Sequence, residues 1–231
     1  MRLSEKYRPK KLADIVGQPP VRFLQRLVME PYPCCVMLVG GPGVGKSTAA
    51  LATAHELGCY DRKTWPKENP PEYHIANNTG LHKVVGSEMQ ADVAREMFAP
   101  CGTLRLRYGS TSGFNVLLLE EFEHVSPAAH VFLKDALENL PKNLIVLATS
   151  NDLAKLSKAL LQRFRIYQFR GDLAFLQAGV ERLRHVWNLE APGIPFPTEV
   201  AAGWGWDPKD NTYSLRSALD EMSDYLTLAV A

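Results

Sequence analysis

Residues Gly40 to Ser47 read GGPGVGKS, and this segment restricts the fold more than any other part of the chain. It matches the pattern G-x-x-x-x-G-K-[ST] at every fixed position. Its glycines allow backbone N–H groups to curve around phosphate oxygens, because no Cβ atom stands in the way. A helix that follows directs its positive end at the same anion. We therefore expect a nucleotide phosphate site between a buried strand and a helix.

Apolar runs and helical patterns alternate around this loop. Cys34 to Val39 is a continuous apolar run, typical of a strand buried on both faces of a parallel sheet. Ser47 to Leu57 is rich in alanine and leucine and favours a helix. Further strands are predicted at Val116 to Leu119, Leu144 to Ala148 and Ile166 to Phe169, and further helices at Val21 to Met29, Met89 to Phe98 and Pro127 to Leu140. This order predicts a three-layer α/β fold with a parallel sheet.

The strand pattern stops after Arg170. Leu173 to Trp187 and Ser214 to Leu228 have helical spacing and are joined by a segment rich in Pro, Gly and Trp. We therefore predict two units: a phosphate-loop ATPase domain of residues 1–170 and a small all-helical lid domain of residues 171–231.

Composition limits the cellular setting and the partners. The formal net charge is only +1, so any contact with nucleic acid must use a local basic surface. No apolar segment approaches the roughly 20 residues that span a bilayer, and no signal-peptide pattern is visible. We expect a soluble intracellular protein, cytoplasmic or nuclear in a eukaryote, that does not contact a membrane.

Two acidic residues follow the second apolar run, which reads VLLLEEFE from Val116 to Glu123. This segment resembles a Walker B motif, in which an acid at the end of an apolar strand holds the water shell of the magnesium ion and a second acid orients the attacking water. We assign Glu120 to the first role, with Ser47, and Glu121 to the second, while Lys46 reaches the β- and γ-phosphates. Aspartate is usual at the first position, and the extra methylene of Glu120 moves its carboxylate outward by roughly 1.5 Å. The alternative is a strand that runs into an exposed acidic loop.

Polar residues also follow the third apolar run, as Thr149-Ser150-Asn151. The side chain of Asn151 could reach the γ-phosphate or the attacking water from there. The alternative is an ordinary turn and helix cap, which Ser and Asn both favour.

The order of these motifs, followed by Arg163 and Arg216, resembles that of an AAA+ ATPase. The opening segment from Glu5 to Gln18, EKYRPKKLADIVGQ, resembles the start of DNA clamp-loader ATPase subunits, namely the replication factor C small subunits and their bacterial and phage relatives. In that family this segment wraps the adenine. The resemblance implies base contacts by Tyr7, Arg8, Pro9, Val16 and Gly17. The alternative is a basic, solvated N-terminal arm.

The resemblance extends to the phosphate loop and to two arginines. It implies nucleotide contacts by Gly41, Pro42, Gly43, Val44, Gly45, Lys46, Ser47 and Thr48. Gln162-Arg163-Phe164 stands where the family has Ser-Arg-Cys, so Arg163 has the position of an arginine finger that reaches a neighbouring subunit's γ-phosphate. Arg216 has the position of the lid arginine that contacts nucleotide in its own subunit. Each could instead be an ordinary surface or ion-paired arginine.

By this resemblance the cofactors are ATP and Mg²⁺, and the partners are other clamp-loader subunits, a sliding clamp and primer–template DNA. Clamp-loader subunits normally continue into a helical collar domain, which we do not expect in this chain. Two other functions stay open. One is a helicase, branch-migration motor or fork-maintenance ATPase. The other is a structural subunit that binds ATP with little turnover.

Two weaker features bear on these partners. Met97-Phe98 ends the helix that carries clamp contacts in the family, although an apolar pair at a helix end also fits a core position. A DNA-facing surface could include Lys83, Arg95, Arg105, Arg107 and Lys134, although scattered basic residues usually form a solvated face.

Overall fold

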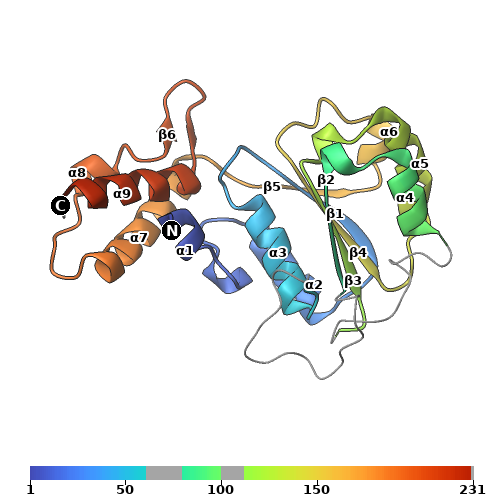
Figure 1. Cartoon of the computed structure of the whole chain (residues 1–231), viewed down its shortest axis with the longest axis horizontal. Helices are drawn as coiled ribbons and strands as arrows, with labels where there is room; N and C mark the ends of the chain where they lie inside the picture. Colours follow the sequence, from blue (N-terminus) through green and yellow to red (C-terminus); the bar gives the residue numbers. More distant parts are fainter. Residues whose placement is uncertain (61–79, 100–111, 230–231) are drawn as a thin grey trace.

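The computed structural model describes residues 1–60, 80–99 and 112–229. Within these residues five parallel strands form one sheet, in the order β2-β3-β4-β1-β5, with helices on both faces (Figure 1). The strands are β1 (Cys34–Val39), β2 (Leu81–Val85), β3 (Asn115–Glu120), β4 (Leu144–Ser150) and β5 (Arg165–Gln168). The predicted α/β fold with a parallel sheet is therefore confirmed.

The sheet separates two hydrophobic clusters. Val36 and Leu38 of β1 face helices α2 (Val21–Met29) and α3 (Lys46–Glu56). Cys35 and Met37 face the opposite side. That side is covered by α4 (Ala91–Phe98), α5 (Pro127–Glu138) and α6 (Lys158–Leu161). Because successive side chains point to opposite faces, both faces must be apolar, and this explains the unbroken apolar runs in the sequence.

Strand β2 was not expected from the sequence. It contains His82 and Lys83, and its side chains are only partly buried after Leu81. Its position at the edge of the sheet formed by the described residues accounts for this mixed pattern, since within them β2 has one neighbouring strand and less cover. The alternating pattern of Leu104 to Tyr108 also fits a strand, and that segment lies outside the described residues.

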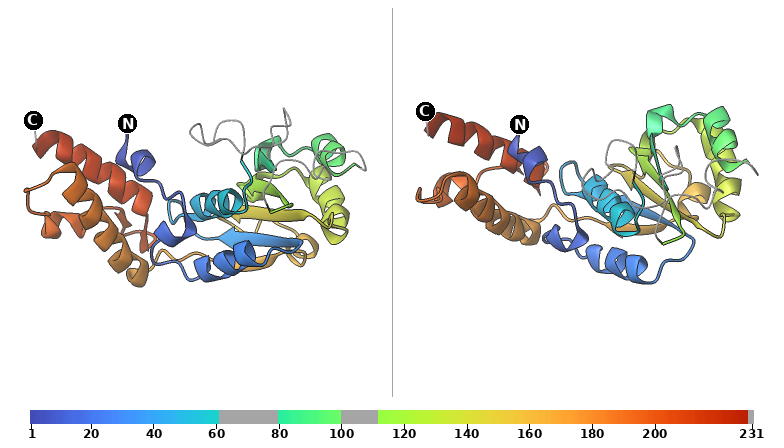
Figure 2. Two further views of the ribbon diagram at one scale, coloured as in Figure 1. Left: turned by 90° about the horizontal axis from the view of Figure 1, so that it is seen from below. Right: turned by 60° about the horizontal axis from the view of Figure 1, so that its bottom comes forward.

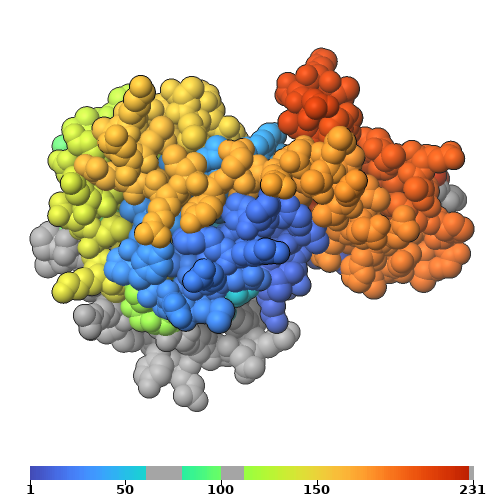
Figure 3. Space-filling model, turned by 180° about the vertical axis from the view of Figure 1, so that it is seen from behind, coloured from blue at the N-terminus to red at the C-terminus, as the bar shows by residue number. Residues whose placement is uncertain are grey.

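The C-terminal part contains α7 (Leu173–Glu190), α8 (Thr198–Ala201) and α9 (Leu215–Ala229). Its helical character agrees with the prediction. Between α8 and α9 the chain also forms a short antiparallel ladder, β6 (Trp206–Asp207) with β7 (Thr212–Tyr213), which projects from the molecule and was not expected (Figures 1 and 3). The division into two domains near residue 170 stays a prediction.

The N-terminal segment contains two short helical turns, the α-helical turn α1 (Leu3–Lys6) and the 3-10 turn η1 (Leu12–Asp14). Helix α1 lies against α9, far from it in sequence (Figure 2). The Ser4 hydroxyl donates a hydrogen bond to Asp220, and Arg2 lies 3.6 Å from the same carboxylate. The two ends of the described chain thus stabilise one another.

None of the helices in the described ranges is both long enough and apolar enough to cross a membrane.

Gly179 tests the packing of α7. A Cβ atom at this position would lie 2.4 Å from Cε1 of the buried Tyr213 ring. Gly→Ala inside a helix normally gains up to about 1 kcal/mol. At Gly179 we expect the opposite sign, a loss of about 1–3 kcal/mol of unfolding free energy, because the ring is enclosed.

Denaturant unfolding measures this loss. Gly203→Ala is the matched control, since its nearest neighbour, the carbonyl oxygen of Val200, lies 3.6 Å from the added carbon. We expect the control to change stability by less than about 0.5 kcal/mol. A stabilised Gly179→Ala variant would contradict the packing described for α7.

Candidate nucleotide-binding site

The phosphate loop connects the end of β1 to the start of α3, as the sequence predicts. Gly43 and Gly45 have φ angles of 72° and 102°, which glycine adopts without strain. A Cβ atom on Gly43 would lie 2.0 Å from the hydroxyl oxygen of Ser214, just before α9. Glycine is therefore required at this position by its backbone angle and by the close approach of the C-terminal part.

Lys46 is buried, and its ammonium is enclosed by three acceptors. Nζ donates to the carbonyl oxygens of Gly40 at 2.8 Å and Gly41 at 2.6 Å, and to Oδ1 of Asn151 at 2.9 Å. Burial lowers the pKa of Lys46 to about 8, an effect that Arg216 reinforces and Glu123 opposes. The folded chain therefore brings Lys46 and Asn151 into contact, although they come from different strand ends.

Glu123 is a site residue that sequence reasoning missed. Its Oε1 accepts hydrogen bonds from the backbone N–H of Asn151 at 3.1 Å and from Nδ2 of the same residue at 2.9 Å. Burial acts to raise the pKa of Glu123, but hydrogen bonds from backbone N–H groups and from the side chains of Ser150 and Asn151 hold it below its ordinary value. The sequence feature that could have indicated Glu123 as a site residue is the third acid in the run EEFE.

A cavity of about 340 Å³, here called the phosphate cavity, opens in front of these groups. Most of its lining was predicted as site residues: Arg8, Pro42, Gly43, Gly45, Lys46, Ser47, Thr48, Glu120, Glu121, Asn151 and Arg216. The rest of the lining consists of Lys83, Val85, Thr149 and Ser150. Gly41 is not among these residues, and it contributes its carbonyl oxygen to Lys46.

Glu120, the predicted magnesium ligand, lies at the edge of this cavity in an ion pair. Nζ of Lys83 is 2.6 Å from Oε2 of Glu120. Because β2 and β3 are parallel and Val85 is in register with Glu120, the side chain of Lys83 can reach the end of β3. Lys83 was considered for a DNA-facing surface, whereas here it faces the phosphate cavity.

Glu121 and the strand end of β4 are joined through the backbone. Glu121 has a φ angle of 53°, and its N–H donates to the hydroxyl of Thr149 at 3.3 Å. Its side chain is exposed at the cavity. Oxygen donors from Ser47, Glu120 and Glu121 thus share one cavity, and such donors are the kind that Mg²⁺ prefers.

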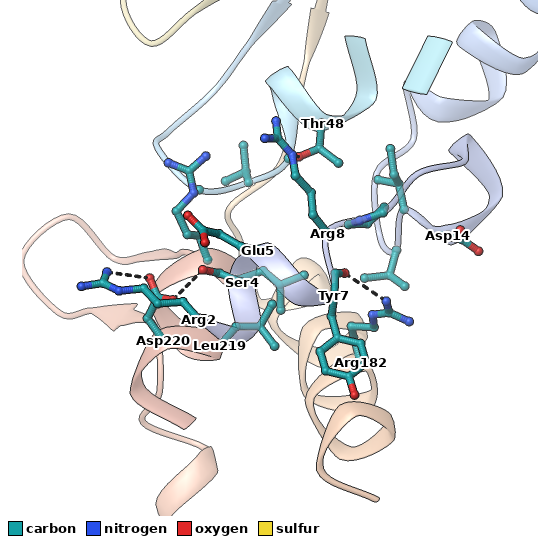
Figure 4. A pocket seen from close by; sticks show the side chains of 18 residues that line it. Arg2, Ser4, Glu5, Tyr7, Arg8, Asp14, Thr48, Arg182, Leu219 and Asp220 are labelled. Atoms are coloured by element: carbon teal, nitrogen blue, oxygen red, sulfur yellow. Dashed lines mark hydrogen bonds and ion pairs between the residues drawn. The ribbon is translucent and has the colours of Figure 1, made fainter. Parts of the chain in front are cut away.

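A second cavity, of about 290 Å³, lies between the N-terminal segment, the phosphate loop and α9, and we call it the N-terminal cavity (Figure 4). Its lining includes four of the residues predicted to contact the base, namely Tyr7, Arg8, Pro9 and Val16, together with Val44. Gly17 is not in this lining. With a φ angle of 67°, it instead lies close to Phe175 and Ala178 of α7. Arg216 lines both cavities.

Tyr7 also connects the N-terminal segment to α7. Its hydroxyl donates to Oε1 of Glu190, which the ammonium of Lys6 also contacts. The backbone carbonyl of Tyr7 accepts a hydrogen bond from Arg182 at 3.3 Å (Figure 4). The wall of the N-terminal cavity is therefore held by contacts to the C-terminal helices.

Arg163 is not among the residues that line either described cavity. Its guanidinium lies 2.6 Å from Glu138 of α5, and its side chain is 28% exposed. An arginine finger that serves a neighbouring subunit would also lie away from the nucleotide of its own subunit. The position of Arg163 therefore does not test the finger role, which stays a prediction.

The apolar pair at the end of α4 occupies a core position in part. Phe98 is buried, and its ring contacts that of Phe132 edge-on, while Met97 is partly buried. This agrees with the core interpretation of Phe98, and clamp contacts stay untested. Two basic residues considered for DNA, Arg105 and Arg107, lie outside the described residues.

The lowered pKa of Lys46 predicts proton uptake when ATP binds. Phosphates stabilise the ammonium, so binding raises its pKa above about 8. At pH 8 about half of the free molecules have a neutral Lys46, and we expect an uptake of about 0.5 proton per ATP bound. ATP affinity should correspondingly fall as the pH rises above 8.

Calorimetric titration in buffers of different ionisation enthalpy measures this uptake. At pH 6.5 Lys46 is already protonated in the free protein, so its uptake should vanish and this pH serves as the internal control. Equal uptake at both pH values would show that another group is responsible.

Comparison with known families agrees with this geometry. The sequence profile of the family described as "ATPase family associated with various cellular activities (AAA)" matches residues 36–171. The replication factor C small subunit of Thermofilum pendens is 30% identical over 195 residues, which are 82% of this chain and 53% of that protein. The replication factor C large subunit of Methanocella arvoryzae is 28% identical over 226 residues, 95% of this chain and 35% of that protein. The chain thus spans about half the length of that small subunit.

Among solved structures, the Thermotoga maritima RuvB Holliday junction branch migration motor has a TM-score of 0.67 and 22% identity. The likeness covers 97% of this chain and 68% of that one, and it concerns the fold alone. Because the family profile covers more than half of the sequence and includes the phosphate loop, both strand-end motifs and Arg163, the chain belongs to the ATPase family associated with various cellular activities (AAA).

Proposed function

We propose that this chain binds ATP with Mg²⁺ and hydrolyses it as a subunit of a DNA sliding-clamp loader. The observation that carries the ATPase assignment is the convergence of Lys46, the two acids Glu120 and Glu121, Asn151 and Arg216 on the phosphate cavity. Similarity to replication factor C subunits over 82% to 95% of the chain supports the clamp-loader assignment.

In this proposal the residues of the phosphate cavity have separate roles in binding phosphate, binding Mg²⁺ and orienting water. Lys46 leaves its three acceptors and contacts the β- and γ-phosphates, and Arg216 contacts the nucleotide from the C-terminal part. Ser47 and Glu120 would hold Mg²⁺, which neutralises phosphate charge when it is bound. For this, Glu120 must give up its ion pair with Lys83. Glu121 orients the attacking water.

The N-terminal cavity would hold the base, against Tyr7, Arg8, Pro9 and Val16. ATP binding would bring subunits together so that the assembly opens a sliding clamp and grips primer–template DNA, and hydrolysis would release the clamp. A branch-migration motor has less support, because the likeness to RuvB at 22% identity concerns only the fold. An ATP-binding subunit with little turnover is the outcome expected if the Lys83–Glu120 pair persists.

The function is tested by ATPase assays with primed DNA and the matching sliding clamp. We expect turnover to rise at least about tenfold when both are added together, because binding of both completes the assembled site. Lys46→Ala should abolish this turnover, since no other mobile cation of the loop can replace it. Glu121→Gln should bind ATP normally and retain it without hydrolysis.

Glu199→Gln on α8 is the matched control for Glu121→Gln, because Glu199 is exposed and away from both cavities. It should leave turnover unchanged. Turnover that does not change when clamp and DNA are added would argue against the clamp-loader assignment. Loss of ATP binding in Glu121→Gln would argue against the role assigned to Glu121.

Arg163 tests whether hydrolysis requires a neighbouring subunit. We expect the isolated chain to turn over slowly, at a specific rate that rises with protein concentration. Arg163→Ala should lower the assembled rate by on the order of 10³, as loss of an arginine finger does. Mixing Arg163→Ala with Lys46→Ala subunits should restore activity that neither variant has alone, because some interfaces then pair an intact loop with an intact arginine.

Lys158→Ala is the control, since Lys158 is exposed on α6 and close to Arg163 in sequence. A rate that is independent of concentration and insensitive to Arg163→Ala would leave Arg163 as a structural partner of Glu138.

A further inference from the structure

The side chain of Asn151 is held between an anion and a cation. Its Nδ2 donates to Oε1 of Glu123 at 2.9 Å, while its Oδ1 accepts from Nζ of Lys46 at 2.9 Å. Its backbone N–H donates to the same Glu123 oxygen at 3.1 Å. Both ends of the side-chain amide therefore have a charged partner.

These partners determine which way the amide is turned. In the reverse orientation Oδ1 would face the Glu123 carboxylate, and the NH₂ group would face the Lys46 ammonium. Both contacts would then be repulsive, and two charge-assisted hydrogen bonds would be lost. The carbonyl end of Asn151 is thus directed toward the phosphate loop.

Glu123 is suited to hold this orientation. It is 7% exposed and lies in the 3-10 turn η4 (Phe122–His124), directly after Glu121. The same turn is joined to the end of β4 by the bond from the Glu121 N–H to Thr149. Glu121, the proposed water-orienting acid, is therefore the N-cap of the same short turn that contains Glu123.

We propose that Glu123 is a positioning residue that turns Asn151 so that its Oδ1 serves as a hydrogen-bond acceptor for the attacking water, and not as a donor to the γ-phosphate. This inference rests on the proposed ATPase function. Phosphate oxygens and Oδ1 are both acceptors and cannot bond to each other. When the phosphates draw Lys46 away, Oδ1 loses its partner and becomes free for a water molecule.

The water would then donate one hydrogen to Oδ1 and the other to the carboxylate of Glu121. Its oxygen bonds to the γ-phosphorus as the bond from phosphorus to the ADP oxygen breaks. The electron pair leaves with ADP, and the proton taken by Glu121 passes to the product phosphate. Lys46 leaves Oδ1 when it moves to the phosphates. The acceptor Oδ1 therefore becomes available to water when ATP is bound.

A pair of exchanged substitutions tests this role. Asn151→Asp alone sets two carboxylates side by side, and we expect single-turnover hydrolysis to fall by on the order of 10²-fold. Adding Glu123→Gln reverses the side-chain hydrogen bond, since the amide NH₂ group introduced by this second change can donate to the new carboxylate, whose other oxygen remains an acceptor facing the loop. The amide oxygen of the same group can still accept the backbone N–H of residue 151, which bonds to Glu123 in the wild-type chain. The double variant should recover to within about tenfold of the wild-type rate.

If Asn151 instead donates to the γ-phosphate, the double variant places a carboxylate beside that anion. Its hydrolysis would stay as low as in Asn151→Asp, and ATP would bind more weakly relative to ADP. This result would overturn the proposal. Our proposal predicts a ratio of ATP to ADP dissociation constants within about threefold of wild type for the double variant.

The ratio of ATP to ADP dissociation constants can be measured without turnover. It therefore distinguishes failure of the proposed function from failure of the proposed orientation of Asn151. Absence of hydrolysis in the wild-type chain with clamp, DNA and partner subunits would reject the proposed function, while the ratio would still test the orientation of Asn151. The control Asn139→Asp/Glu199→Gln makes the same chemical changes at exposed positions and should alter neither measurement. Circular dichroism confirms that each variant is folded.

Discussion

The parallel pairing of β1 with β4, and of β4 with β3, brings three strand ends to the same edge of the sheet. Each of these ends continues into a polar segment: the phosphate loop after β1, the acidic turn after β3 and Asn151 after β4. In an open parallel sheet, ligands bind at this edge because the connections leave a crevice there. The contacts of Lys46 and Glu123 with Asn151, and of Glu121 with Thr149, depend on that alignment.

The N-terminal segment and the C-terminal helices complete the site from outside the sheet. Gln18 is buried, and its side chain bonds to the carbonyl of Val44 in the phosphate loop and to both backbone groups of Arg170. Tyr7 is held by Glu190 and Arg182 of α7. The N-terminal segment, the phosphate loop and the start of the C-terminal part are thus joined by direct hydrogen bonds. A nucleotide between them would contact all three.

The charged groups of the site satisfy each other. Lys46 is held by two loop carbonyls and Asn151, and Lys83 neutralises Glu120. In the proposed function each pairing changes when ATP and a metal ion bind, because the anion and the cation compete for the same groups. Binding therefore rearranges an ordered polar network, and the orientation of Asn151 by Glu123 is the part that can persist.

The sequence by itself determined the type of fold and the position of the phosphate loop, because both depend on local patterns. Continuous apolar runs identify strands buried on both faces, and the spacing of Gly40 to Ser47 identifies the loop. Strand β2 could not be recognised, because its edge position leaves a mixed pattern. Only the tertiary structure decided that Lys83 pairs with Glu120, that Gly17 packs on α7 and that Glu123 holds Asn151. These contacts join residues far apart in the chain, and the parallel register and the close approach of the C-terminal helices create them.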